Sequence, residues 1–175
     1  MRLHFFGFIL NLLAIRAIGI KKFYTYELKS QYNANIEWKE YTHILVCTKA
    51  TNSLGKEWGD KLMNKGIKQD SICVVAPIPK WMTKTPGSKN IIQTSIAHLE
   101  KNVPVFIDWE ERLVIANKIN EYPTIILVAK DNRGNLSEIG RASGKYTDNK
   151  CNNLRKESNN SSPKIFRLFQ MGLDN

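Results

Sequence analysis

Residues 103–144 constrain the fold of this chain more than any other stretch. The segment opens with a β-branched and aromatic run at residues 103–107, which is typical of a buried strand. Asp108 follows and can cap a helix, with Glu111 three positions later to complete a capping box. Apolar residues then recur at roughly helical spacing as far as Ile119. The stretch therefore predicts a strand followed by a short helix.

The second part of this stretch predicts a hairpin that begins at a proline. Tyr122 precedes Pro123, and the residue before a proline is pushed toward extended geometry. Residues 124–129 are apolar and β-branched, residues 131–134 form a polar turn cluster, and residues 136–139 return as a second strand. The residues alone leave the Tyr122–Pro123 bond either cis or trans.

The first half of the chain predicts a strand, a helix and a second strand. Residues 42–48 and 71–76 have the apolar composition of buried strands. Asn52 or Ser53 can cap the helix between them, and Gly66 stands where the helix should end. One apolar stripe follows the helix at i, i+4 and i+8: Leu54, Trp58 and Leu62. Such a unit is expected to be right-handed with parallel strands.

A proline-rich loop and a further helix connect the two halves. Ser88 can cap this helix, which carries Ile92, Ile96 and Leu99 on one face.

This order of elements resembles the thioredoxin fold, over residues 42–144. Tyr122, Pro123 and Thr124 match the position at which that family carries a cis-proline loop beside its active site. The resemblance, which is to the exported thiol-disulfide oxidoreductase-like branch, implies an α/β fold in a single domain. Its central mixed β-sheet would be flanked by helices, and the helix that begins at Ser88 would lead into the central strand at Val103.

The chain departs from that family at the residues that carry its chemistry. The C-x-x-C loop aligns with residues 51–54, where Thr51 and Leu54 replace the two cysteines. Disulfide exchange needs two thiols, so we expect no thioredoxin-type reductase activity. The resemblance implies instead a non-catalytic protein that binds a peptide or a partner protein near the cis-proline loop. The candidate binding residues are Thr51, Asn52, Ser53, Trp81, Tyr122 and Pro123.

The alternative is a thiol redox enzyme, an oxidoreductase or peroxidase-like protein, that uses Cys47. This cysteine lies at the end of a predicted strand, where a buried core thiol is the competing interpretation. Cys73 is inside a strand pattern and is interpreted as core. Cys151 lies in a polar segment, so we expect it to be exposed. Cys151 or an external thiol would act as the resolving thiol, and the other interpretations are an intermolecular bridge or no role.

The formal net charge of +10 favours acidic partners or an anionic surface. The lysines are spread along the chain and form no basic motif, which argues against nucleic acid as the partner. No cysteine, histidine or carboxylate spacing indicates a metal, and no sequence motif indicates a cofactor. The oligomeric state is left open.

The ends of the chain suggest processing and export. Residues 1–20 combine a basic start, an apolar centre and small residues toward the end, as in a signal peptide or a membrane anchor. A buried helix is the other interpretation, and cleavage is left open. We expect a periplasmic, secreted or membrane-anchored protein with an N-terminal extension at residues 21–41, a thioredoxin-like domain at residues 42–157, and a flexible tail at residues 158–175.

Overall fold

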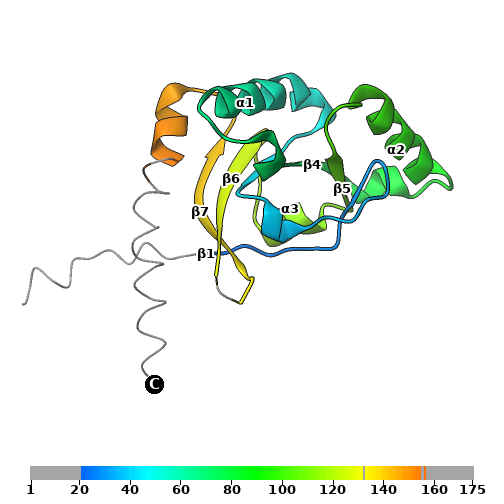
Figure 1. Ribbon diagram of the computed structural model, residues 1–175. Coiled ribbons are helices and arrows are strands. Elements are labelled where there is room, and N and C mark those ends of the chain that lie inside the picture. The colour runs from blue at the N-terminus through cyan, green and yellow to red at the C-terminus, as the bar shows by residue number, and fades with distance from the viewer. Residues whose placement is uncertain (1–20, 132, 155, 157–175) are drawn as a thin grey trace, which may run out of the picture.

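The computed structural model describes residues 21–131, 133–154 and 156, and these form one sheet with helices on both faces (Figure 1). The strands are β1 Lys21–Lys22, β2 Lys29–Ser30, β3 His43–Val46, β4 Ile72–Ile78, β5 Val105–Trp109, β6 Thr124–Lys130 and β7 Leu136–Ser143. The α-helices are α1 Asn52–Asn64, α2 Ser88–Leu99 and α3 Arg112–Ala116, with further helical residues at 148–154. Short 3-10 helices are η1 Trp38–Glu40, η2 Lys49–Thr51, η3 Gln69–Ser71 and η4 Lys80–Thr83.

The sheet has the strand order β1-β7-β6-β3-β4-β5-β2, so β3 is its central strand. Strand β3 pairs parallel with β4 and antiparallel with β6. The prediction of a parallel strand-helix-strand unit at β3, α1 and β4 is confirmed. The prediction that α2 leads into the central strand is wrong, because β5 lies between β4 and the edge strand β2.

Two apolar layers hold the helices against the sheet, because successive strand residues point to opposite faces. Leu45 and Ile125 face α1, where they pack with Trp58 and Leu62. Ile44, Val46, Ile126 and Val128 face the other side, where they pack with residues of α3 and of the N-terminal segment. Figure 1 shows α1 and α3 on opposite sides of the sheet.

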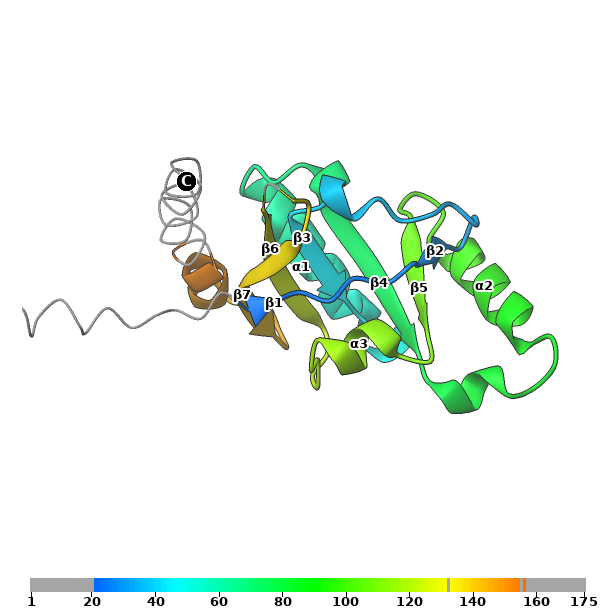
Figure 2. The same ribbon diagram turned by 90° about the horizontal axis from the view of Figure 1, so that it is seen from below.

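Residues 21–41 are integrated into this sheet rather than appended to it. The segment adds β1 to one edge and β2 to the other, and Figure 2 shows it crossing the α3 face between them. Its side chains Phe23, Leu28 and Ile36 are buried in the same core as the central strand. Asn117, at the end of α3, fixes the crossing segment: its side chain accepts from the N–H of Tyr24 at 2.9 Å and donates to the Tyr24 carbonyl at 2.8 Å.

Helix α2 is attached more loosely than α1. None of its residues is buried, and both Ile91 and Leu99 are largely exposed. It lies beyond the β5–β2 edge of the sheet (Figure 2). Its N-cap is Gly87, with φ of 80°, so the predicted cap at Ser88 is one residue late.

Three local expectations are corrected by the structure. Asn52 and Ser53 lie inside α1, since the helix start is capped one turn earlier by a capping box between Thr48 and Thr51. Asp108 does cap α3, but Glu111 makes no capping box, because it is the N-cap residue itself and has φ of 57°. Cys151 is buried, not exposed.

Some predictions fall outside the part of the chain that the structure describes. The proposed signal peptide or anchor at residues 1–20 and the tail at residues 158–175 are among them. Within the described ranges no helix has both the length and the apolar character needed to span a membrane.

Candidate functional site

The carboxyl end of β3 and the start of β6 meet at one edge of the sheet. Val46 pairs with Thr124, so the residues that follow and precede them, Cys47 and Pro123, are neighbours across the two strands. The Tyr122–Pro123 peptide bond is cis. The first turn of α1 begins at the same edge, because η2 leads directly from β3 into the helix. The structure thus brings the cis-proline loop and the start of α1 together, as the resemblance implies.

The three candidate residues at the start of α1 have different roles. The Thr51 hydroxyl is engaged locally, since it accepts from the Thr48 N–H at 3.0 Å. The Asn52 amide donates to a carboxylate oxygen of Glu100 at 2.8 Å. Ser53 is exposed, and its hydroxyl makes no hydrogen bond to any other described residue. Of the three, Ser53 is therefore the one most open to a ligand.

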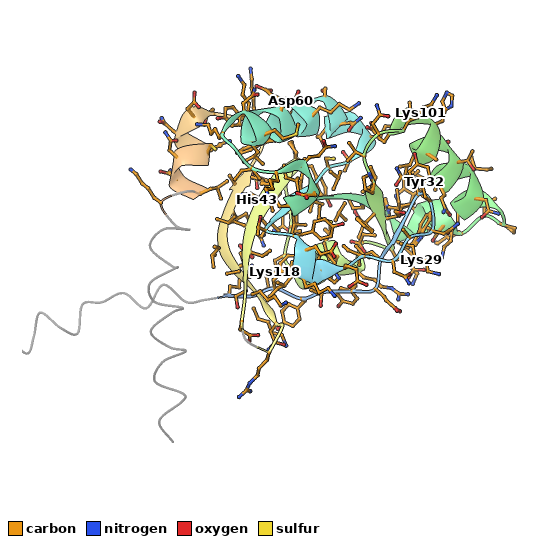
Figure 3. All side chains as sticks on the ribbon, in the orientation of Figure 1. Lys29, Tyr32, His43, Asp60, Lys101 and Lys118 are labelled. Carbon is orange, nitrogen blue, oxygen red and sulfur yellow. The ribbon has the colours of Figure 1, made fainter. Side chains whose placement is uncertain are left out.

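Glu100 connects the end of α2 to this turn. Its carboxylate also meets the Lys56 ammonium at 3.1 Å, and its carbonyl accepts from the Gln31 side chain at 3.0 Å. Lys101, which follows Glu100, accepts with its carbonyl from the hydroxyl of Tyr32 at 3.2 Å. Figure 3 shows Tyr32 and Lys101 near α2. Sequence reasoning missed Glu100, because no local pattern indicates a contact across 48 residues.

The main chain of the cis-proline loop has a free position. Among the described residues, no group bonds to the main-chain N–H or C=O of Tyr122. Unpaired main-chain groups at the surface are what an extended peptide uses when it adds to a sheet edge. The Tyr122 side chain is half-buried, and burial, with the nearby carboxylates of Glu111 and Asp108, raises its pKa to about 12.

The loop is held firmly on both sides of this free position. The Thr124 hydroxyl donates to the Glu121 carbonyl at 2.6 Å and lies 2.7 Å from the hydroxyl of Ser143. The carbonyl of Pro123 accepts from the N–H of Gly144 at 2.8 Å. The unpaired groups of Tyr122 are therefore presented from a fixed loop.

Asp108, in β5, fixes the start of α3. Its carboxylate is fully buried and accepts from the N–H groups of Leu113 and Val114, both at 3.1 Å. Burial raises the pKa of this carboxyl, and the two N–H groups oppose that shift. The sequence signal was correct for the capping role of Asp108, but it gave no indication that this carboxylate contributes to the raised pKa of Tyr122.

Cys47 lies under the first turn of α1. The side chain is buried, and a Cβ built on Gly55 would sit 3.2 Å from both its Cβ and its Sγ. Burial, reinforced by the carboxylate of Glu100 and opposed by Lys56, raises the pKa of the thiol to about 11. Since the thiolate is the reactive form, this cysteine is a weak nucleophile at neutral pH.

The other two cysteines are separated from Cys47 by their surroundings. Cys73 packs with Ile44 on the α3 face of the sheet, opposite α1. Burial strongly raises the pKa of its thiol. Cys151 is enclosed with Trp58 and Leu45. In the described part of the chain all three cysteines are free, and no group of three metal-ligating side chains comes together.

Trp81 is not part of this cluster. It is exposed in η4, which follows β4 and contacts α2, while the cis-proline loop precedes β6 on the other side of β3. The structure places Thr51, Asn52, Ser53, Tyr122 and Pro123 at one edge of the sheet and leaves Trp81 apart. The side chain of Pro123 is fully buried, so it offers no surface to a ligand.

Solved structures that share this fold include a thioredoxin and a thiol-disulfide isomerase. The N-terminal domain of PilB from Neisseria gonorrhoeae is 18% identical, with 69% of this chain and 81% of that chain covered and a TM-score of 0.51. The pneumococcal exposed lipoprotein thioredoxin (Etrx1) from Streptococcus pneumoniae is 16% identical, with 75% and 98% covered and a TM-score of 0.52. A thiol-disulfide isomerase from Corynebacterium glutamicum is 12% identical, with 74% and 90% covered and a TM-score of 0.50.

At these identities the similarity defines the fold, and the predicted single-domain thioredoxin-like α/β architecture is confirmed. No protein-family model matches the sequence, and no curated protein matches it significantly. By their names, one of these proteins is a thioredoxin and another is a thiol-disulfide isomerase.

Proposed function

We propose that this protein is a non-catalytic thioredoxin-like protein that binds an extended peptide segment of a partner protein. The peptide lies between the cis-proline loop and the first turn of α1. It pairs through its main chain with Tyr122 and contacts Ser53 on the opposite side.

The observation that carries the proposal is the free main chain of Tyr122. Its N–H and C=O are unpaired among the described residues, while the residues around it are fixed by hydrogen bonds. Pairing with a fixed loop costs little ordering of the protein, which favours affinity. Main-chain pairing also tolerates many side chains, so the partner is recognised mainly as an extended chain.

The absence of catalysis is supported by the sulfur chemistry. The loop that carries two cysteines in redox-active members carries Thr51 and Leu54 here. The nearest thiol, Cys47, is covered by Gly55 and has a pKa of about 11. Less than about one thiol in a thousand is ionised at neutral pH when the pKa is this high.

The binding proposal is tested with a displayed library of unstructured, cysteine-free peptides panned on the folded protein. Two variants separate the site from the rest of α1: Ser53→Arg, which places a bulky side chain at the site, and Asp60→Arg, which adds the same side chain two turns along the same helix face. Both positions are exposed. We expect selected peptides to lose binding to Ser53→Arg and to keep it with Asp60→Arg. Equal binding to both variants would place the peptide elsewhere.

The redox alternative, an enzyme that uses Cys47, is favoured by the names of the solved relatives. It is tested by disulfide reduction with a dithiol donor, run beside Cys47→Ser. We expect no turnover by the unmodified protein. Robust turnover that disappears in Cys47→Ser would put the redox function first.

Export is proposed together with this function. It is supported by the basic, apolar and small-residue order of residues 1–20, and one solved relative is, by its name, an exposed lipoprotein. N-terminal sequencing and fractionation of protein from expressing cells test it. A chain that begins at Met1 and remains in the cytosol would contradict it.

A further inference from the structure

We propose that Trp58 is a positioning residue for the peptide site, because its indole fixes the cis-proline loop relative to α1. The inference rests on the proposed function, since the loop it fixes is the one that would bind the peptide. Three residues form the connection: Trp58 in α1, Gly144 after β7, and Pro123 in the loop.

The first link is between α1 and Gly144. Trp58 is fully buried, with its ring edge-on to Tyr146 at a centroid distance of 4.9 Å. Its Nε1–H donates to the carbonyl of Gly144 at 2.8 Å. A buried indole N–H left without a partner would cost the desolvation of that group, so the ring and the carbonyl are held together.

The second link is between Gly144 and the loop. The N–H of Gly144 donates to the carbonyl of Pro123 at 2.8 Å. Proline has no N–H, so this carbonyl is the only main-chain hydrogen-bonding group that Pro123 has. Gly144 adopts φ of 76°, a conformation that side-chain-bearing residues rarely take. One glycine thus bonds to the helix with its carbonyl and to the loop with its N–H.

The turn around Gly144 is also held from behind. The ammonium of Lys150, from helical residues 148–154, donates to the carbonyl of Ser143 at 2.6 Å and to that of Lys145 at 3.2 Å. The position of Gly144 is therefore set by its neighbours, and the indole bond connects α1 to this fixed point beside the loop.

In this arrangement both walls of the site, the first turn of α1 and the cis-proline loop, are connected to the same helix. The first turn of α1 provides Ser53, and Trp58 lies in the next turns of the same helix. A peptide that pairs with Tyr122 while touching Ser53 needs a constant separation of the two walls. Loss of the indole N–H would allow the loop to shift without removing the aromatic ring from the core.

The test compares Trp58→Phe with Trp38→Phe. Trp38 is a matched control, because its Nε1–H also donates to a main-chain carbonyl, that of Tyr26, at 2.8 Å, and its ring is also edge-on to an aromatic neighbour, Phe23. Hydrogen exchange of the Gly144 amide is measured without peptide, and affinity is measured with a peptide selected from the displayed library.

We expect faster exchange of the Gly144 amide and about two- to tenfold weaker peptide binding in Trp58→Phe, with neither change in Trp38→Phe. Unchanged Gly144 exchange in Trp58→Phe, or equal changes in both variants, would overturn the inference. If no peptide binds even the unmodified protein, the proposed function fails, and Gly144 exchange alone decides whether the connection exists.

A measurement on the unmodified protein covers the case in which Trp58→Phe does not fold. The indole resonance of Trp58 should shift when the selected peptide is added, while that of Trp38 should not. An unshifted Trp58 indole with bound peptide would overturn the inference.

Discussion

Gly55 is a residue at which α1 lies close against the end of β3. A Cβ at this position would lie 3.2 Å from the Cβ and Sγ of Cys47, whereas a Cβ on Gly59, one turn later, would meet nothing within 4 Å. The two glycines occupy the same helix, so they share the same gain in helix propensity on replacement by alanine. Only at Gly55 would the added methyl group be crowded by a neighbouring side chain, that of Cys47.

We therefore expect Gly55→Ala to destabilise the protein by about 1–2 kcal/mol, because the end of β3 is buried and cannot move away. Gly59→Ala should stabilise it by about 0.5–1 kcal/mol. Urea unfolding of the two variants measures both effects. A stabilised Gly55→Ala protein would mean that Cys47 is not packed under the helix as described.

His43 gives the fold a dependence on pH. The imidazole is buried at the start of β3 (Figure 3), with Nδ1 2.8 Å from the Thr42 hydroxyl, and burial lowers its pKa from 6.5 to about 4. Above pH 6.5 the ring is neutral in both the folded and the unfolded chain, so it makes no pH-dependent contribution. Between about pH 6.5 and 4 only the unfolded chain takes up the proton, and stability falls as the pH falls.

We expect this residue to account for a loss of at most about 3 kcal/mol in the free energy of unfolding between pH 7 and 4. In His43→Gln the free energy of unfolding should fall by that much less between pH 7 and 4. Urea titrations of both proteins at several pH values in this range measure it. Identical drops in the two proteins would show that His43 is not the titrating group.

At the scale of elements, α1 and the 122–143 hairpin follow from local patterns. The stripe of Trp58 and Leu62 matches the buried face of α1, and the predicted strands fall within a few residues of β6 and β7. The N-terminal segment could not be predicted in this way. Its strands β1 and β2 are two residues each, and their pairing partners lie far along the chain.

The N-terminal segment should contribute strongly to stability. Phe23 is buried between β7 and Trp38, while the adjacent Tyr24 is about half exposed at 48%. We expect Phe23→Ala to cost about 3–5 kcal/mol and Tyr24→Ala to cost less than about 0.5 kcal/mol. Thermal or urea unfolding measures the difference. Similar small losses in both variants would show that this segment is not part of the core.

At the scale of the whole molecule, the fold class was predictable from the sequence and the strand order was only partly so. The order strand, helix, Tyr122–Pro123 and hairpin indicated a thioredoxin-like sheet. The place of β5 beside β4 was not visible, because a run such as residues 103–107 has the same composition in a central strand as beside an edge strand. The burial of Cys151 was missed because its polar neighbours in sequence hide its contacts with Trp58 and Tyr146.

The candidate site shows the same division between local and long-range information. The positions of Tyr122 and Ser53 came from alignment with a known motif, and the structure brings both to one edge of the sheet. The carboxylate of Glu100 and the bond between Trp58 and Gly144 are long-range contacts for which the sequence offers no pattern.

The measurement that tests the central claim most directly is an NMR titration of the ¹⁵N-labelled protein with a peptide selected from the displayed library. The account predicts that the Tyr122 amide resonance shifts and that its hydrogen exchange slows, because the N–H gains a partner in the peptide main chain. An unchanged Tyr122 amide, with the shifts confined to another surface such as the one around Trp81, would contradict it.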